Sequence, residues 1–195
     1  MKMNKEQFEE DIIPILVLTI VVCIAVITLS IINSITEGPI EDAEKEKIKE
    51  LLEEQFPDLA TYEEDTPSKD VYTVKNESGA ILGYAFNIVA SGYGGDIKIL
   101  VAIENTSLSE DDIILRGISI ISNTETPGLG AKITEESWLE QFSGANMNEV
   151  FLKADGGNID AISGATISSS AVVDAIQKEA GAKVKSILDE REGGV

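Results

Sequence analysis

Short hydroxyl side chains gather around one glycine in the stretch DAISGATISSSAVVDAI, residues 160 to 176. Five serine or threonine residues fall between Ser163 and Ser170, beside Gly164, and an apolar pattern of helical spacing follows. One interpretation is a helix start, because Ser and Thr side chains accept hydrogen bonds from the free N–H groups of a first turn. A second is a phosphate site, because a helix N-terminus carries partial positive charge and unpaired donors. The motif by itself leaves both interpretations open.

The composition excludes several kinds of chemistry. The chain has 195 residues, no histidine and one cysteine, Cys23, so it has no histidine base or ligand, no CxxC pair and no cysteine-ligated iron–sulfur cluster. We therefore expect no metal site, and any redox chemistry must come from an organic cofactor. Any catalysis would have to use carboxylates, hydroxyls or lysines, and we assign no catalytic residue. The net charge of −20 also disfavours binding to nucleic acid.

Most of the glycines that indicate a functional position, rather than an incidental one, fall in three loops. They are residues 91–97 (SGYGGDI), 124–132 (TETPGLGAK) and 155–166 (DGGNIDAISGAT). Glycine permits left-handed backbone angles and a close approach of the backbone to a ligand. Each loop by itself is typical of a turn, and the three together indicate the floor of a pocket.

The residues Asp160, Ser163-Gly164-Ala165-Thr166 and, upstream, Glu125-Thr126-Pro127-Gly128-Leu129-Gly130 resemble the two signatures of the FMN-binding domain family. The resemblance covers nearly the whole chain, with an anchor in front and the threonine just before the last helix. It implies that FMN is joined covalently, through a phosphoester, to Thr166 by a flavin transferase. Asn123 stands where relatives often carry a histidine, which bears on a flavin contact and not on attachment.

The resemblance also assigns roles to neighbouring residues. Ser163, with Asp160, is expected to serve the transferase, with a turn-forming Asx role as the alternative for Asp160, and Gly164 and Ala165 complete the motif. Glu125 and Thr126 are expected at the polar edge of the flavin ring, with close backbone approach at Gly128 and Gly130. Leu129 and Tyr93 are expected as apolar walls, with core packing as the alternative. Lys132 or Lys153 is expected to help neutralise the phosphate. The alternative for each is an ordinary surface lysine.

Within this family, the length of the chain resembles that of the G subunits of Rnf-type ion-translocating ferredoxin:NAD oxidoreductases. Sister C subunits of the sodium-pumping NADH:quinone reductase are usually longer. The resemblance implies an electron-transfer subunit that is not catalytic alone, with membrane and iron–sulfur subunits as partners. Two alternatives stay open: a flavoprotein that serves another electron-transfer chain, and an anchored interaction domain without a redox role.

Residues 12–35 contain no charge and are long enough to cross the ~30 Å core of a bilayer. A signal peptide is the alternative, but the segment is long for one and its N-terminal flank is acidic. Lys2 and Lys5 give a slight preference for a cytoplasmic N-terminus, with the domain on the outer side of the cell membrane. The predicted organisation is a tail (1–11), an anchor (12–35), an amphipathic linker helix (36–57) and an FMN-binding domain (58–195).

The domain is predicted to be α+β with an antiparallel sheet. Four strands are expected at 71–75, 80–90, 96–104 and 113–122, with the first two joined in a hairpin, and a short one at 150–154. Helices are expected at 134–142 and from about Ser169 to Glu190. In the linker helix, Ile48, Leu51, Leu52 and Phe56 form an apolar stripe, which favours docking on the domain over a free stalk.

Overall fold

The structure, a computed structural model, describes residues 5–64, 70–105 and 113–193, so the first four residues of the predicted tail lie outside it. The chain separates into two compact units, Met1–Glu46 and Lys47–Val195, and each is described by itself. The second unit begins within the range predicted as a linker helix.

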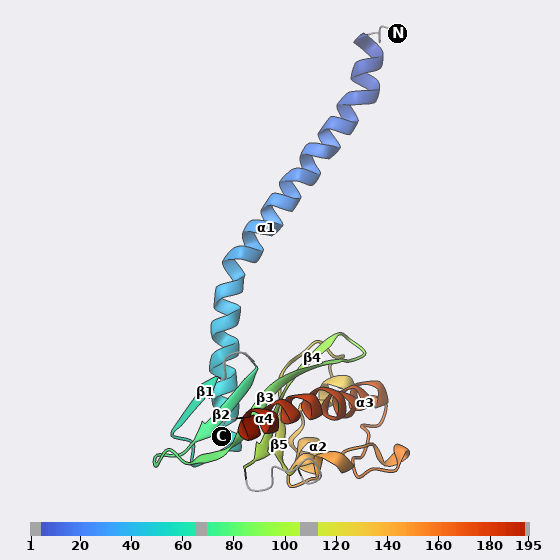
Figure 1. Ribbon diagram of the computed structural model, residues 1–195. Helices are drawn as coiled ribbons and strands as arrows, with labels where there is room; N and C mark the ends of the chain where they lie inside the picture. The colour runs from blue at the N-terminus through green and yellow to red at the C-terminus, as the bar shows by residue number, and fades with distance from the viewer. Residues whose placement is uncertain (1–4, 65–69, 106–112, 194–195) are drawn as a thin grey trace. The chain divides into compact units, whose positions relative to one another are not determined.

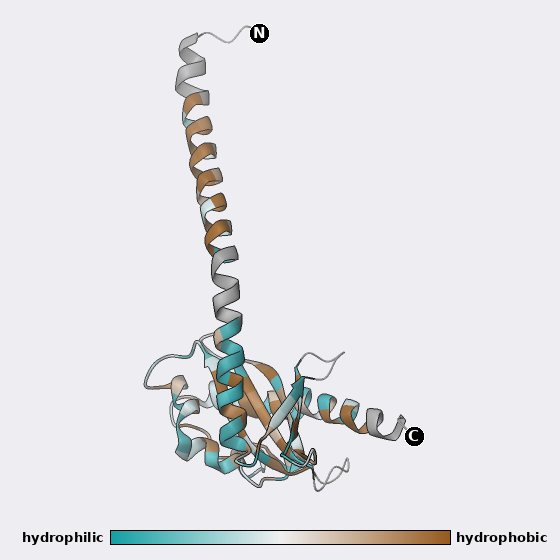
Figure 2. Ribbon diagram, turned by 90° about the vertical axis from the view of Figure 1, so that its left-hand side faces the viewer, coloured by the Kyte–Doolittle hydropathy of each residue, from teal (hydrophilic) through white to brown (hydrophobic). Residues whose placement is uncertain are grey.

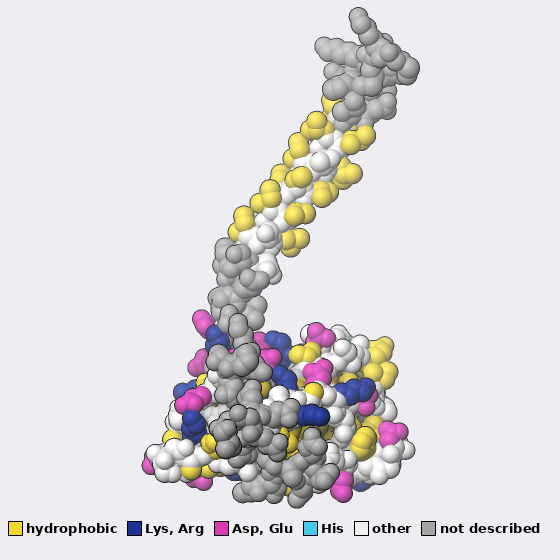
Figure 3. Space-filling view, viewed as in Figure 1, with side chains coloured by type: hydrophobic (Ala, Val, Ile, Leu, Met, Phe, Trp, Pro, Cys, Tyr) yellow, Lys and Arg dark blue, Asp and Glu magenta, His cyan; other side chains and the backbone are white. Residues whose placement is uncertain are grey.

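Helix α1 (Lys5–Gln55) forms the described part of the first unit up to Glu46, and its last turns belong to the second unit. Its segment Ile13–Asn33 is long and apolar enough to cross a membrane, and every side chain in it is exposed. Hydrophobic residues predominate along this segment in the ribbon (Figure 2), and apolar side chains cover the face that Figure 3 shows. The hydroxyls of Thr19 and Thr28 donate to the carbonyls of Ile15 and Ile24, each at 2.8 Å, so their polar groups are satisfied within the helix.

The second unit is built on a five-stranded antiparallel sheet in which the strands follow one another in chain order (Figure 1). Its strands are β1 (Thr61–Glu64), β2 (Val71–Lys75), β3 (Ile81–Ser91), β4 (Asp96–Glu104) and β5 (Leu115–Asn123). The helices α2 (Glu136–Leu139), α3 (Thr166–Ala175) and α4 (Gly181–Gly193) follow the sheet, and a π-helical turn, Ile176–Ala180, joins the last two. The predicted α+β class is therefore confirmed.

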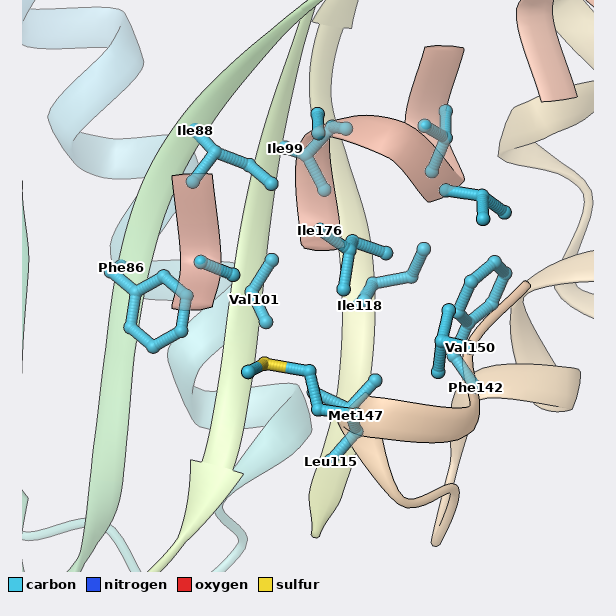
Figure 4. Close-up of a cluster of buried hydrophobic side chains, with 14 of the residues drawn as sticks. Phe86, Ile88, Ile99, Val101, Leu115, Ile118, Phe142, Met147, Val150 and Ile176 are labelled. Carbon is cyan, nitrogen blue, oxygen red and sulfur yellow. The ribbon is translucent and has the colours of Figure 1, made fainter. Parts of the chain in front are cut away.

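Successive side chains of a strand point to opposite faces of the sheet, and because both sets are largely apolar here, the sheet has two apolar faces. On one face Phe86, Ile88, Ile99 and Val101 meet Ile176 and other side chains from the helical half of the domain (Figure 4). The predicted buried side of the last helix is confirmed, since its residues lie in this cluster or pack against it: Val172, Ala175, Ile176, Ala180, Val184, Ile187 and Leu188.

The second face of the sheet packs against the last turns of α1. Ile48, Leu51, Leu52 and Phe56 are buried there together with Tyr72, Val74, Ala85, Leu100 and Ala102. The predicted apolar stripe is therefore docked on the domain rather than free.

The structure corrects several element boundaries. Strand β1 was not predicted, and the last helix begins at Thr166 rather than near Ser169. The helix expected over 134–142 is confined to α2, with 3₁₀ turns on either side. The strand expected at 150–154 is wrong: both Asp155 and Gly157 donate backbone N–H groups to the Leu152 carbonyl, which closes a tight turn and leaves one bridge to Ile159.

Candidate functional site

The hydroxyls at the start of α3 do not act as a simple helix cap. The N-cap position is held by Ala165, and no side chain caps it. Ser169 Oγ accepts from the Ile162 N–H at 3.0 Å and donates to the Ala165 carbonyl at 3.1 Å, so it ties the preceding loop to the helix. The backbone bends into the helix through Gly164, whose φ of +80° favours glycine.

Thr166 differs from Ser168 and Ser169 in its own first turn of α3. Ser168 and Ser169 are buried and hydrogen-bonded, whereas Thr166 is exposed and its hydroxyl has no hydrogen-bond partner among the described residues. Within the same part of the chain, the N–H groups of Thr166, Ile167 and Ser168 have no partner either. The first turn of α3 therefore presents a free hydroxyl next to free backbone donors, which suits an anion.

A pocket of about 450 Å³ opens beside Thr166. This volume lies within the roughly 300–1,000 Å³ that ligand pockets usually have. Three parts of the chain form its wall: the β3–β4 loop, the loop after β5 and the first turn of α3. The lining residues are Tyr93, Glu125, Thr126, Leu129, Gly130, Gly164, Ala165, Thr166, Ile167 and Ser168.

The pocket brings together most of the residues that the sequence singled out. Ser163 and Gly128 are the two predicted site residues that do not line it. Tyr93 and Leu129 are 73% and 49% exposed, so the alternative that they belong to the core is wrong.

Two lining residues, Ile167 and Ser168, were missed. Ile167 is 58% exposed and lies outside the buried face of α3. An apolar residue directly after the motif threonine, but outside the apolar stripe of the helix, is the signal in the sequence that could have identified it as a lining residue.

Glu125 is buried in the lining of the pocket, and its carboxylate joins the β3–β4 loop to the first turn of α3. One oxygen accepts from the Ser168 hydroxyl at 2.9 Å and the other from the Gly94 N–H at 3.2 Å. The Glu125 N–H donates to the Asn123 side-chain carbonyl at 3.1 Å, so Asn123 shapes this loop. Gly130 lies against the carboxylate rather than open space, since a Cβ added there would lie 2.2 Å from it.

Asp160 and Lys153 form an ion pair near the motif, with 2.6 Å between Lys153 Nζ and Asp160 Oδ2. The Asp160 N–H donates to Gln141 and its carbonyl accepts from the Trp138 indole, so the backbone here is held by the α2 region. The Asp160 carboxylate thus pairs with a lysine and forms no Asx turn. Lys132 is exposed and, like Lys153, does not line the pocket.

A second hollow of about 490 Å³ lies between the end of α1, β5 and α2, and it contains none of the predicted site residues. Among the residues that the structure describes, no three His, Cys, Asp or Glu side chains are grouped to hold a metal ion. The pocket beside Thr166 is therefore the site that the sequence and the geometry share.

Comparison with known proteins points to the same region. The model of the FMN-binding domain family matches residues 92–180, which contain the whole pocket. The chain is 32% identical over 171 residues to the G subunit of the ion-translocating oxidoreductase complex of Methanosarcina acetivorans, covering 83% of this chain and 88% of the relative. It is 31% identical over 185 residues to the G subunit of the Na⁺-translocating ferredoxin:NAD⁺ oxidoreductase complex of Acetobacterium woodii, covering 83% and 86%.

Among solved structures, NqrC of Shewanella oneidensis is similar with a TM-score of 0.47 and 21% identity, over 68% of this chain and 74% of that one. The two relatives above match over most of their own length and most of this chain. On this similarity, the chain belongs to the FMN-binding domain family and groups with the G subunits of the ion-translocating oxidoreductase complexes.

Proposed function

We propose that the chain is a membrane-anchored flavoprotein subunit that carries electrons within an Rnf-type ion-translocating ferredoxin:NAD oxidoreductase, through FMN joined covalently to Thr166. The observation that carries the proposal is the Thr166 hydroxyl, which is exposed, unpartnered among the described residues and set at the mouth of the pocket. The names of the complexes to which the two relatives belong state ion translocation, and the name of the family states the cofactor, FMN.

The residues around Thr166 fit a phosphoester. The free N–H groups at the start of α3 and the partial positive charge of the helix end stabilise an anion at this position. This stabilisation matters in a chain with a net charge of −20, which otherwise repels an added negative group. Lys153 is already paired with Asp160, so we assign the phosphate to the backbone donors rather than to a lysine.

The pocket walls fit a flat aromatic ligand. Tyr93, Leu129 and Ile167 expose apolar surface around the opening and would hold the isoalloxazine ring of a flavin. FMN, when bound, supplies the electron transfer, and the protein binds and orients it. The chain has no histidine and a single cysteine, so its own side chains offer no redox pair for this purpose.

The apolar part of α1 serves as the anchor in this proposal. Its exposed apolar side chains need a lipid environment, and its two threonine hydroxyls are already satisfied within the helix, as a membrane requires. A single flavin on a one-helix anchor cannot move ions, so coupling to ion translocation belongs to partner subunits. A flavin transferase is the maturation partner.

The test is to produce the full chain together with a flavin transferase, denature it and map the flavin-bearing peptide by mass spectrometry. We expect one FMN on the peptide that contains Thr166, and none in Thr166→Ala. Ser170→Ala is the matched control, because it removes a hydroxyl one turn further along α3, away from the pocket, and should keep the flavin. Full flavin content in Thr166→Ala would contradict the proposed attachment, and colour lost on denaturation of the wild-type chain would contradict a covalent bond.

A further inference from the structure

The only charged side chain buried among the described residues is Glu125, at 6% exposure. Burying a carboxylate is costly unless hydrogen bonds compensate for the lost water. Here Ser168 Oγ and the Gly94 N–H supply one bond to each oxygen, and Ser168 itself is 2% exposed. Each oxygen thus accepts one hydrogen bond from the protein, and the two bonds connect α3 to the β3–β4 loop.

Two glycines make room for this carboxylate. A Cβ at Gly92 would lie 2.0 Å from Glu125 Oε1, and a Cβ at Gly130 would lie 2.2 Å from Oε2. Real Cβ atoms do not come this close to other atoms, so any side chain at either glycine would displace the carboxylate. Glycines from two separate loops therefore border the oxygens of a single residue, which indicates a site built around that carboxylate.

The carboxylate lies at the end of α3 that carries Thr166. Ser168, its hydroxyl partner, is in the first turn of the helix, two residues after Thr166. A negative charge beside the first turn of a helix is stabilised by the helix dipole. The link therefore fixes both the position and the direction of the turn that presents the Thr166 hydroxyl.

From these contacts we propose that Glu125 is a positioning residue, which ties the first turn of α3 to the β3–β4 loop and holds Thr166 at the pocket before any flavin is attached. This inference rests on the proposed function only for its consequence, the attachment of FMN. It adds a structural role for Glu125 to the ring contact that the sequence predicted, which stays a prediction because Glu125 also lines the pocket.

The tie can be measured in the full chain without flavin, by amide hydrogen exchange in detergent. The reporters are the Gly94 N–H, which donates to Glu125, and the Ser169 N–H, which donates to the Ala165 carbonyl at 3.0 Å. In Glu125→Ala both amides should exchange about 10- to 100-fold faster, the effect of losing a hydrogen bond to a charged group. Exchange in the centre of β4 should change less.

Two further variants separate position from charge. Glu125→Gln should restore slow exchange, because its amide group can accept from Gly94 and donate to the Ser168 oxygen. Gly130→Ala should reproduce the Glu125→Ala result although the carboxylate stays in the chain, because the new methyl group displaces it. Gly181→Ala is the matched control, since a Cβ there has no atom within 4 Å, and it should leave both amides unchanged.

The functional consequence is a slower initial rate of flavin incorporation by the transferase. We expect at least a tenfold decrease in Glu125→Ala and Gly130→Ala, and near wild-type rates in Glu125→Gln and Gly181→Ala. Unchanged exchange at Ser169 in both Glu125→Ala and Gly130→Ala would overturn the inference. A Glu125→Gln chain as impaired as Glu125→Ala would also overturn it, by showing that the charge itself is required. Failure of the wild-type chain to gain flavin would contradict the proposed function and leave the exchange result valid.

Discussion

The domain should not be stable without the last turns of α1, although the family match begins only at residue 92. Ile48, Leu51, Leu52 and Phe56 are 4%, 6%, 0% and 1% exposed, and they cover the second face of the sheet. Burial of each such side chain contributes about 1.5–3 kcal/mol, or roughly 6–12 kcal/mol for the four. This is comparable with the whole stability of a small domain, about 5–15 kcal/mol.

Contacts at the end of α1 add to this. Arg116 Nε donates to the Gln55 carbonyl, where it also complements the negative end of the helix, and its guanidinium lies 4.8 Å from the centre of the Phe56 ring. A chain that begins at residue 58 leaves the apolar face of the sheet and Arg116 exposed. It should therefore aggregate or unfold at much lower urea concentration than a chain that begins at residue 47.

The assay is urea unfolding of the two truncated chains, followed by the fluorescence of Trp138, the single tryptophan, which is buried at 6% exposure. In the full chain, Leu52→Ala should reduce the free energy of unfolding by about 2–5 kcal/mol. Leu18→Ala is the matched control on the same helix, because Leu18 is 65% exposed in the other unit and should leave domain unfolding unchanged. Equal midpoints for the two truncated chains would refute the reasoning.

Two further predictions concern the anchor and a buried phenol. Protease added to sealed, right-side-out cells should remove the domain, as expected for an outer location with residues 12–35 retained in the membrane; protection there, with cleavage only in inverted vesicles, would reverse the orientation. Burial, reinforced by the negative charge of Glu64, raises the pKa of Tyr72 to about 12, so the folded state favours the neutral phenol. The stability that this provides is present below about pH 10, the ordinary pKa of tyrosine, and is lost as the pH rises toward 12. Between pH 9 and pH 11 the free energy of unfolding should therefore fall less in Tyr72→Phe than in the wild-type chain.

Local sequence patterns predicted the parts of this protein whose structure depends on neighbouring residues. Runs of β-branched and aromatic residues bounded by turn residues marked the strands at 71–75, 80–90 and 96–104. The apolar stripe of α1 marked its buried face, because burial on one side of a helix imposes a period of 3.6 on the sequence. The motif around Thr166 and the glycine loops predicted where a pocket forms. The strand at 150–154 failed because the turn after Leu152 competes with pairing, which apolar composition does not reveal.

Tertiary structure decided which hydroxyl of the motif is exposed in the pocket and what Glu125 contacts. The sequence offered five similar hydroxyls. Packing buries Ser168 and Ser169 in hydrogen bonds and keeps Ser163 and Ser170 out of the pocket lining, while Thr166 is exposed within it. Glu125 and Ser168 are 43 positions apart, and no local pattern indicates that they meet. Their contact arises because the sheet and α3 bring distant loops together, where a buried carboxylate must find its donors from whichever segments lie beside it.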